Sequence, residues 1–162
     1  MKIVAIIAAR GGSRGLPRKN VLPLCGKPLI KWTINAAMKS KLVDSIFVST
    51  EDREIANISD GGGLGPQVLI RPKCLAGDTS QTPEVYRFAL RQITEDYKFS
   101  PEVAVISTPT CPLRTSQDID GAIELYLKYG KGSVFAGSID RRYHWRTYEG
   151  TLEGEYESAD MG

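Results

Sequence analysis

The sequence has little of what several common classes of protein require. Its three cysteines, Cys25, Cys74 and Cys111, lie far apart and form no CxxC pair, which argues against a zinc site and predicts reduced thiols. No apolar run approaches the roughly 18 residues that a membrane-spanning helix needs. The apolar start is followed by arginines rather than by a signal-peptide cleavage site. We therefore expect a cytoplasmic protein with no membrane association.

The chain also lacks the partners of a nucleophilic enzyme and the charge of a nucleic-acid binder. His144 is the single histidine and falls in a polar, irregular stretch, so a Ser-His or Cys-His pair is not expected. The formal net charge is only +2, and no aromatic platform interleaves the basic residues near the N-terminus. A reaction that depends on charge neutralisation and positioning, such as nucleotidyl transfer, fits this composition better.

What the sequence does have is an alternation of short β-branched runs and helical patterns. Strands are expected at 2–9, 44–49, 67–70, 102–107 and 132–138. Helices are expected at 29–41, after a Thr50 cap, at 82–97 and after a Thr115 cap. Connections of this length predict an α/β fold with a mostly parallel sheet and helices on both faces, a Rossmann-like three-layer α/β/α arrangement. We expect residues 1–138 to form this domain and 139–162 to leave it.

The first expected strand leads into a basic, glycine-rich loop, ARGGSRGLPRKN, at positions 9–20. Its glycines are expected to take φ > 0 and to let backbone N–H groups converge on an anion. Its cations are Arg10, Arg14, Arg18 and Lys19. The loop matches neither a Walker A motif nor a GxGxxG fingerprint. Its position after a buried strand favours phosphate binding over a solvated basic loop.

Two further loops follow expected strands and carry polar side chains. In RPKCLAGDTSQT, Arg71 follows a strand, and Asp78, Thr79 and Thr82 cluster at a helix N-terminus that could attract an anion or serve only to cap the helix. In STPTCPLRT, two prolines shape the backbone around Thr110, and Arg114 could bind a carboxylate or phosphate. A purely structural turn is the alternative there. Ligands of such sheets bind at these carboxyl ends.

Four segments in this order resemble the N-acylneuraminate cytidylyltransferases, also called CMP-sialic acid synthetases. ARGGSRGLPRKN is similar to the family's A-R-x-x-S-K-G-x-x-x-K-N signature, and GKPLIKWTINAAMKSKLVDSIFVSTED to the helix and strand that follow it. RPKCLAGDTSQT resembles R-P-x-x-L-A-x-D-T, and TPTCPLRT resembles Q-P-T-S-P-L-R-T. The resemblance implies a nucleotidyltransferase fold.

The resemblance also implies a reaction and a set of site residues. CTP and a 2-keto-3-deoxy sugar acid would give a CMP-sugar and pyrophosphate, with Mg²⁺, in a homodimer that binds no nucleic acid. Arg10 and Lys19 would be catalytic. The CTP-binding residues would be Arg10, Gly11, Gly12, Ser13, Arg14, Lys19, Asn20, Arg71, Asp78, Thr79 and Thr82. The sugar-acid side would be formed by Thr108, Thr110 and Arg114.

The sequence departs from the family pattern in two respects. Thr108 stands where the family has glutamine and Cys111 where it has serine, which leaves sialic, pseudaminic and legionaminic acids open as the sugar. The aspartates expected to hold Mg²⁺ are not found in this chain and are expected beyond its end, while 139–162 resembles the start of a dimerisation arm or a truncated tail. A 3-deoxy-octulosonate cytidylyltransferase and a catalytically incomplete nucleotide-binding fragment remain alternatives.

Overall fold

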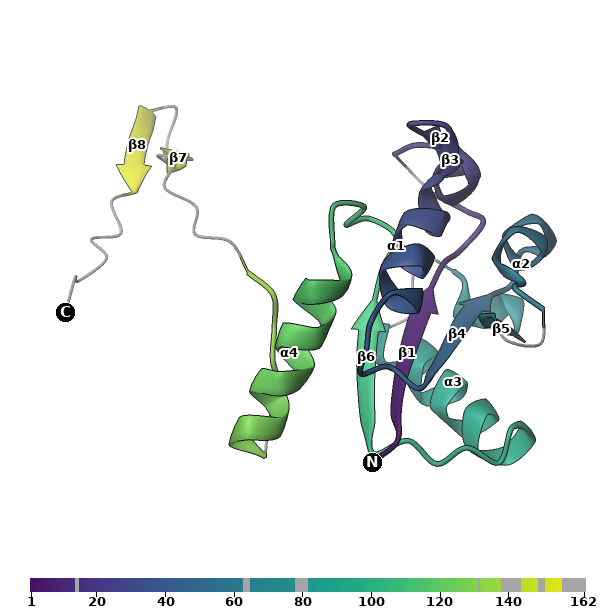
Figure 1. Cartoon of the computed structure of the whole chain (residues 1–162). Helices are drawn as coiled ribbons and strands as arrows, with labels where there is room; N and C mark the ends of the chain where they lie inside the picture. The colour runs from purple at the N-terminus through teal and green to yellow at the C-terminus, as the bar shows by residue number, and fades with distance from the viewer. Residues whose placement is uncertain are drawn as a thin grey trace.

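The computed structural model describes residues 1–13, 15–62, 65–77, 82–130, 132–137, 144–148 and 151–155. The main sheet contains β1 Ile3–Ala8, β4 Ser45–Thr50, β5 Gln67–Ile70 and β6 Val103–Ser107. The α-helices are α1 Leu29–Met38, α2 Arg53–Ser59, α3 Thr82–Asp96 and α4 Ser116–Tyr129. The short elements are η1 Lys19–Val21, β2 Pro23–Leu24, β3 Lys27–Pro28, η2 Lys73–Leu75, β7 His144–Tyr148 and β8 Thr151–Glu155. Figure 1 shows their arrangement.

The main sheet has the strand order β5-β4-β1-β6, and each neighbouring pair in it is parallel. Strand β1 is central, and its Ile6 lies opposite Phe47 of β4 and Ile106 of β6. The chain builds outward from β1 through β4 to β5 and then returns to place β6 on the other side of β1. The strand order therefore reverses between β1 and β6, and the open end at that point is where ligands of such sheets bind.

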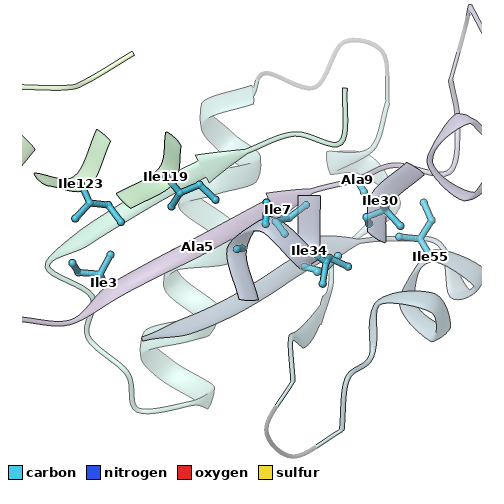
Figure 2. Packing of buried hydrophobic residues seen from close by; sticks show 12 residues of the cluster. Ile3, Ala5, Ile7, Ala9, Ile30, Ile34, Ile55, Ile119 and Ile123 are labelled. Carbon is cyan, nitrogen blue, oxygen red and sulfur yellow. The ribbon is translucent and has the colours of Figure 1, made fainter. Parts of the chain in front are cut away.

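Strand β1 is buried on both faces, which explains its continuous apolar sequence. Its odd-numbered residues, such as Ile7, pack with Ile30 and Ile34 of α1, Ile55 of α2 and Ile119 of α4 in the cluster that Figure 2 shows. Its even-numbered residues pack on the opposite face against α3, in a cluster that includes Val4, Ile6, Phe47, Ala89 and Ile93. The three-layer α/β/α arrangement expected from the sequence is thus confirmed.

The cap residue predicted from the sequence is found at α4 but not at α2. Thr115 and Asp118 form a reciprocal capping box at the start of α4, as the Thr115 cap predicted. At α2 the expected Thr50 cap is wrong, because Thr50 is the last residue of β4 and Asp52 caps the helix by accepting the Ile55 N–H at 3.0 Å. Glu51 consequently lies before the helix and not in its first turn.

Two other local predictions need correction. The strand expected at 132–138 does not form over the described part, 132–137, where the Phe135 side chain is 88% exposed. A short apolar run such as residues 134–136 becomes a strand only when a neighbour pairs with it, and the positive φ of Gly132 begins this segment in a turn conformation. The sequence also gave no sign of the β2–β3 hairpin, whose turn residues Cys25 and Gly26 both have positive φ.

The described residues near the C-terminus form one β-hairpin. Among the described strands, β7 pairs only with β8, in antiparallel register from His144–Glu155 to Tyr148–Thr151. The division into residues 1–138 and 139–162 stays a prediction. No helix in the described ranges is long and apolar enough to cross a bilayer.

Candidate functional site

A cavity of about 680 Å³ lies at the carboxyl ends of β1, β5 and β6, where the strand order reverses. Three loops and the start of α3 form its walls. Its lining residues are Ala8, Arg10, Ser13, Gly15, Leu16, Lys19, Asn20, Arg71, Leu75, Ala76, Gly77, Thr82, Val85, Tyr86, Thr108, Pro109 and Thr110. The volume falls within the roughly 300–1,000 Å³ of typical small-molecule sites. Its location agrees with the ligand position expected for a sheet of this topology.

The cavity brings together most of the site residues predicted from sequence. Those that line it are Arg10, Ser13, Lys19, Asn20, Arg71, Thr82, Thr108 and Thr110. Those described but not lining it are Gly11, Gly12 and Arg114. Arg14, Asp78 and Thr79 lie outside the described residues. Three loops far apart in sequence thus converge on one space, although the role of each residue in binding stays a prediction.

Three side chains fix consecutive backbone groups where β1 enters its loop. Arg71 donates to the carbonyl of Ala9 at 3.4 Å, and the Asn20 amide, 6% exposed, donates to the carbonyl of Arg10 at 2.8 Å. Glu51 accepts the N–H of Gly11 at 2.7 Å. The backbone on both sides of Arg10 is therefore tied to Asn20 at the end of the same loop and to two residues from other segments, and the Arg10 side chain reaches the cavity from a fixed base.

Arg71 is buried at the centre of this region, and its guanidinium is largely engaged with the protein. Besides Ala9, it donates to the carbonyl of Ser49 at 3.2 Å and to the Glu51 carboxylate at 2.9 Å. Its Nε is buried without a hydrogen-bond partner in the protein. Arg71 therefore joins the ends of β1 and β4, and only its Nε is left without a partner.

Gly11 is required for close approach and not for positive φ. Gly11 and Gly12 are absent from the described residues with left-handed φ, so the predicted φ > 0 cradle is wrong at these two positions. A Cβ on Gly11 would lie 2.4 Å from an Asp52 carboxylate oxygen, whereas one on Gly12 would meet nothing within 4 Å. The N–H of Gly11 is also already bonded to Glu51. Packing against the start of α2 therefore explains this glycine.

Arg18 is paired with acidic residues and does not line the cavity. Its guanidinium forms ion pairs with Asp52 and with Glu54, and Nη2 donates to Asp52 Oδ1 at 3.1 Å. The hydrogen bond to Asp52, followed by that to Glu54, raises the pKa of Arg18, while the same guanidinium holds the pKa of Asp52 below its ordinary value. Of the described cations of this loop, Arg10 and Lys19 are the ones that line the cavity.

Tyr86 is a cavity residue that the sequence analysis missed. It is 8% exposed, lines the cavity and belongs to the core cluster under α3. Burial raises the pKa of its hydroxyl, although the charges of Arg71 and Arg114 oppose this shift. The spacing of Thr82, Val85, Tyr86 and Ala89 along one helical face could have placed it beside the predicted Thr82.

The loop after β6 forms another wall of the cavity. The hydroxyls of Thr108 and Thr110 lie 2.9 Å apart, and Pro109 between them is buried. The Thr33 hydroxyl of α1 donates to the Thr108 carbonyl at 3.4 Å, which ties this wall to the helix layer. Arg114 lies outside the cavity lining, with its Nη1 buried and unpartnered in the protein.

The charge of the lining residues suits an anionic ligand. They supply Arg10 and Lys19 as cations together with several hydroxyls, whereas the charge of Arg71 is paired with Glu51 outside the lining, and none of the described lining residues is aspartate or glutamate. Across the described part of the chain, no group of three or more His, Cys, Asp or Glu side chains is arranged to hold a metal ion. Cations and oriented donors of this kind neutralise and position phosphate oxygens.

Comparison with known sequences shows that the chain is similar to cytidylyltransferases. The sequence model described as Cytidylyltransferase matches residues 4–144. The chain is 38% identical over 149 residues to an N-acylneuraminate cytidylyltransferase of Oncorhynchus mykiss, covering 91% of this chain and 32% of that protein. It is 36% identical over 145 residues to a CMP-N,N'-diacetyllegionaminic acid synthase of Legionella pneumophila, covering 90% of this chain and 62% of that protein. The chain thus spans about a third of the first of these relatives and under two thirds of the second.

Solved structures share the fold at lower identity. A CMP:2-keto-3-deoxy-manno-octonic acid synthetase complexed with CTP matches with a TM-score of 0.65 and 20% identity, over 79% of this chain and 48% of that one. Rv0371c of Mycobacterium tuberculosis, solved as a complex with manganese, matches with a TM-score of 0.54 and 16% identity, over 77% and 59%. These likenesses support the three-layer architecture.

Proposed function

Because this chain belongs to the cytidylyltransferase family, we propose that it transfers the cytidylyl group of CTP to a nonulosonic, sialic-type acid. The products are a CMP-sugar and pyrophosphate. The observation that carries the proposal is the cavity at the ends of β1 and β6, whose lining combines Arg10 and Lys19 of the loop after β1 with hydroxyls of the loop after β6. The relatives are named for N-acylneuraminate and for legionaminic acid, which are acids of this type.

The described residues fit the demands of this reaction. A hydroxyl of the sugar acid attacks the α-phosphorus of CTP and a new P–O bond forms. The bond from the α-phosphorus to the oxygen that bridges to the β-phosphate breaks and releases pyrophosphate, and the hydroxyl proton passes to solvent. No covalent enzyme intermediate is needed. Arg10 and Lys19 neutralise the triphosphate, and such preorganised cations stabilise the charge that develops on the leaving group. The remaining predicted CTP contacts come from Ser13, Asn20 and Thr82.

The loop after β6 is the proposed sugar-acid side. Thr108 and Thr110, whose hydroxyls lie 2.9 Å apart, line the cavity together with residues of the basic loop after β1. Hydroxyl groups can donate to a carboxylate or accept from sugar hydroxyls. The names of the relatives include two different nonulosonic acids, so the proposal covers this class and does not choose one sugar.

We propose Mg²⁺ as the cofactor because the family that the sequence resembles implies it. A structure of the same fold was also solved as a complex with manganese. A magnesium ion in nucleotide sites is bound by phosphates and waters together with one or two carboxylates. None of the described lining residues carries a carboxylate, so these described residues do not fit as its protein ligands. A homodimer and a cytoplasmic location likewise stay predictions.

The alternatives have narrower support. A 3-deoxy-octulosonate cytidylyltransferase is favoured only by a likeness of fold at 20% identity. A nucleotide-binding fragment without complete catalytic machinery is consistent with a chain that spans 32% of one relative. Both alternatives share CTP binding with the main proposal, so CTP binding is the first property to test.

Titration calorimetry with CTP tests the proposal directly. We expect Arg10→Ala and Lys19→Ala each to weaken binding by about 1.5–3 kcal/mol, because each removes a hydrogen bond to a charged group. Arg91→Ala on α3 and Lys39→Ala after α1 are matched controls on exposed residues outside the cavity. Failure of the unaltered chain to bind CTP, or unchanged affinity in both cavity variants, would overturn the assignment.

A further inference from the structure

We propose that Glu51 is a positioning residue for the nucleotide loop, acting through the backbone on either side of Arg10. The inference rests on the proposed function, because its readout is CTP binding. Glu51 does not line the cavity. Its carboxylate nevertheless links the two groups that flank Arg10, so it can control the cavity without touching a ligand.

The carboxylate of Glu51 is divided between two partners. Oε1 accepts the Gly11 N–H at 2.7 Å, and Oε2 accepts from Arg71 Nη2 at 2.9 Å. The side chains of Glu51 and Arg71 are only 13% and 3% exposed. A charged pair this well shielded from water depends strongly on its hydrogen-bond geometry, because each group has lost most of its hydration. Glu51 thus fixes the loop and compensates the buried Arg71 at the same time.

Glu51 and Arg71 together hold the chain on both sides of Arg10. Arg71 donates to the carbonyl of Ala9, and Glu51 accepts the N–H of Gly11, so the Glu51–Arg71 pair brackets Arg10. Asn20 holds the carbonyl of Arg10 itself. A residue whose neighbours are fixed in this way presents its side chain with little conformational freedom, and such preorganisation favours binding.

The arrangement requires two acceptors, and only a carboxylate supplies them. A glutamine at this position has one oxygen acceptor and one NH₂ donor. If its oxygen accepts from Gly11, its NH₂ group faces the donor Nη2 of Arg71, and the opposite orientation leaves Gly11 without its acceptor. An aspartate retains the charge, but its shorter side chain cannot span the same two partners. The two substitutions therefore separate the effect of charge from that of reach.

The test is a double-mutant cycle with CTP as the titrant. We expect Glu51→Gln and Glu51→Asp each to weaken CTP binding by roughly tenfold, the effect of losing one charge-assisted contact. In an Arg10→Ala background the same substitutions should change affinity by less than about threefold, since residues that act through one another are not additive. Glu95→Gln, on an exposed part of α3, is the control for the loss of one negative charge.

Melting temperatures of all variants are measured alongside, and Glu51→Asp serves if Glu51→Gln does not fold. A tenfold loss that persists in the Arg10→Ala background would overturn the positioning role, because it would show a general effect on the fold. Unchanged affinity in Glu51→Asp and Glu51→Gln would overturn it as well. If the unaltered chain binds no CTP, it is the proposed function that fails, and that result is distinct from both.

Discussion

Arg18 and Asp52, separated by 34 positions in the sequence, are joined by a paired guanidinium–carboxylate contact that connects the basic loop to the start of α2. Asp52 also accepts the Ile55 N–H as the helix cap. One carboxylate therefore stabilises the helix start and secures the loop. It also leaves no room for a side chain at Gly11.

Substitutions at Asp52 separate these two contributions. Asn caps helices nearly as well as Asp, so Asp52→Asn removes only the ion pair and should lower the free energy of unfolding by about 0.5–1 kcal/mol. Asp52→Ala also removes the cap and should cost about 1 kcal/mol more. Urea denaturation at neutral pH measures both differences. Equal stability of the two variants would show that the cap contributes nothing.

The stability difference between the unaltered chain and Asp52→Asn should depend on pH. Arg18 lowers the pKa of Asp52 in the folded protein relative to the ordinary value of 3.8. A lowered pKa stabilises the fold above the unfolded value, and that contribution is lost as the pH falls through the folded value. Denaturation curves should therefore show a constant difference from about pH 5 to 7, which shrinks as the pH falls below the ordinary value of 3.8 and is lost as the pH passes through the folded value. A difference that grows on acidification would contradict the ion pair.

The two adjacent glycines of the loop should respond very differently to alanine. In Gly11→Ala the new methyl group would lie 2.4 Å from Asp52 Oδ2, so either the loop or the ion pair must shift. We expect a loss of about 1–3 kcal/mol in stability, the range for overpacking, together with weaker CTP binding. Gly12→Ala is the matched control, because nothing lies within 4 Å of the added carbon. Thermal denaturation of both variants decides whether close approach explains Gly11.

The sequence predicted the layers of this fold well because they depend on local patterns. The bounds of β5 agree with the structure, and β1 was recognised because burial on both faces leaves an uninterrupted apolar run. The three loops around the cavity were found through topology, since parallel strands bring their carboxyl ends to one edge. Ser13, Asn20 and Thr108 were expected there only from the family resemblance. Tyr86 was missed although its helical spacing was visible, because tyrosine on a buried face usually indicates core packing alone.

What the sequence could not show are contacts between distant segments. Glu51 fitted the first turn of a helix, and its pairing with Gly11, 40 positions away, emerges only when β1 and β4 lie side by side. Arg18 likewise counted as a cation for phosphate until α2 placed two carboxylates beside it. The run at 132–137 has the composition of a strand, but pairing determines whether a strand forms.

CTP affinity should be sensitive to Asn20→Asp, a substitution that hardly changes the shape of the side chain. Its amide is almost fully buried and donates to the Arg10 carbonyl at 2.8 Å. An ionised aspartate cannot donate, so Asn20→Asp places a carboxylate against that carbonyl and adds negative charge beside the proposed triphosphate. We expect CTP affinity to fall by at least about tenfold, and by less in Asn20→Ala, which adds no charge.

Calorimetry with Asn57→Asp provides the matched comparison for this substitution. Asn57 is exposed on α2 and lines no part of the cavity, so the same change of charge there should leave CTP affinity within about twofold. If Asn20→Asp binds CTP as tightly as the unaltered chain, then neither the carbonyl contact nor the cavity charge controls binding.

The hydroxyl pair of Thr108 and Thr110 allows a test of which wall of the cavity binds the sugar acid and which binds CTP. Thr110→Val keeps the shape of the side chain and removes the hydroxyl that lies 2.9 Å from that of Thr108. If this wall binds the sugar acid, titration with a nonulosonic acid in the presence of CTP should show about a fivefold to tenfold loss, the effect of one unmade hydrogen bond. CTP affinity should change by less than about twofold. Ser116→Ala, outside the cavity, controls for the loss of a hydroxyl nearby. The reverse result, with CTP binding impaired and sugar-acid binding retained, would assign this wall to the nucleotide.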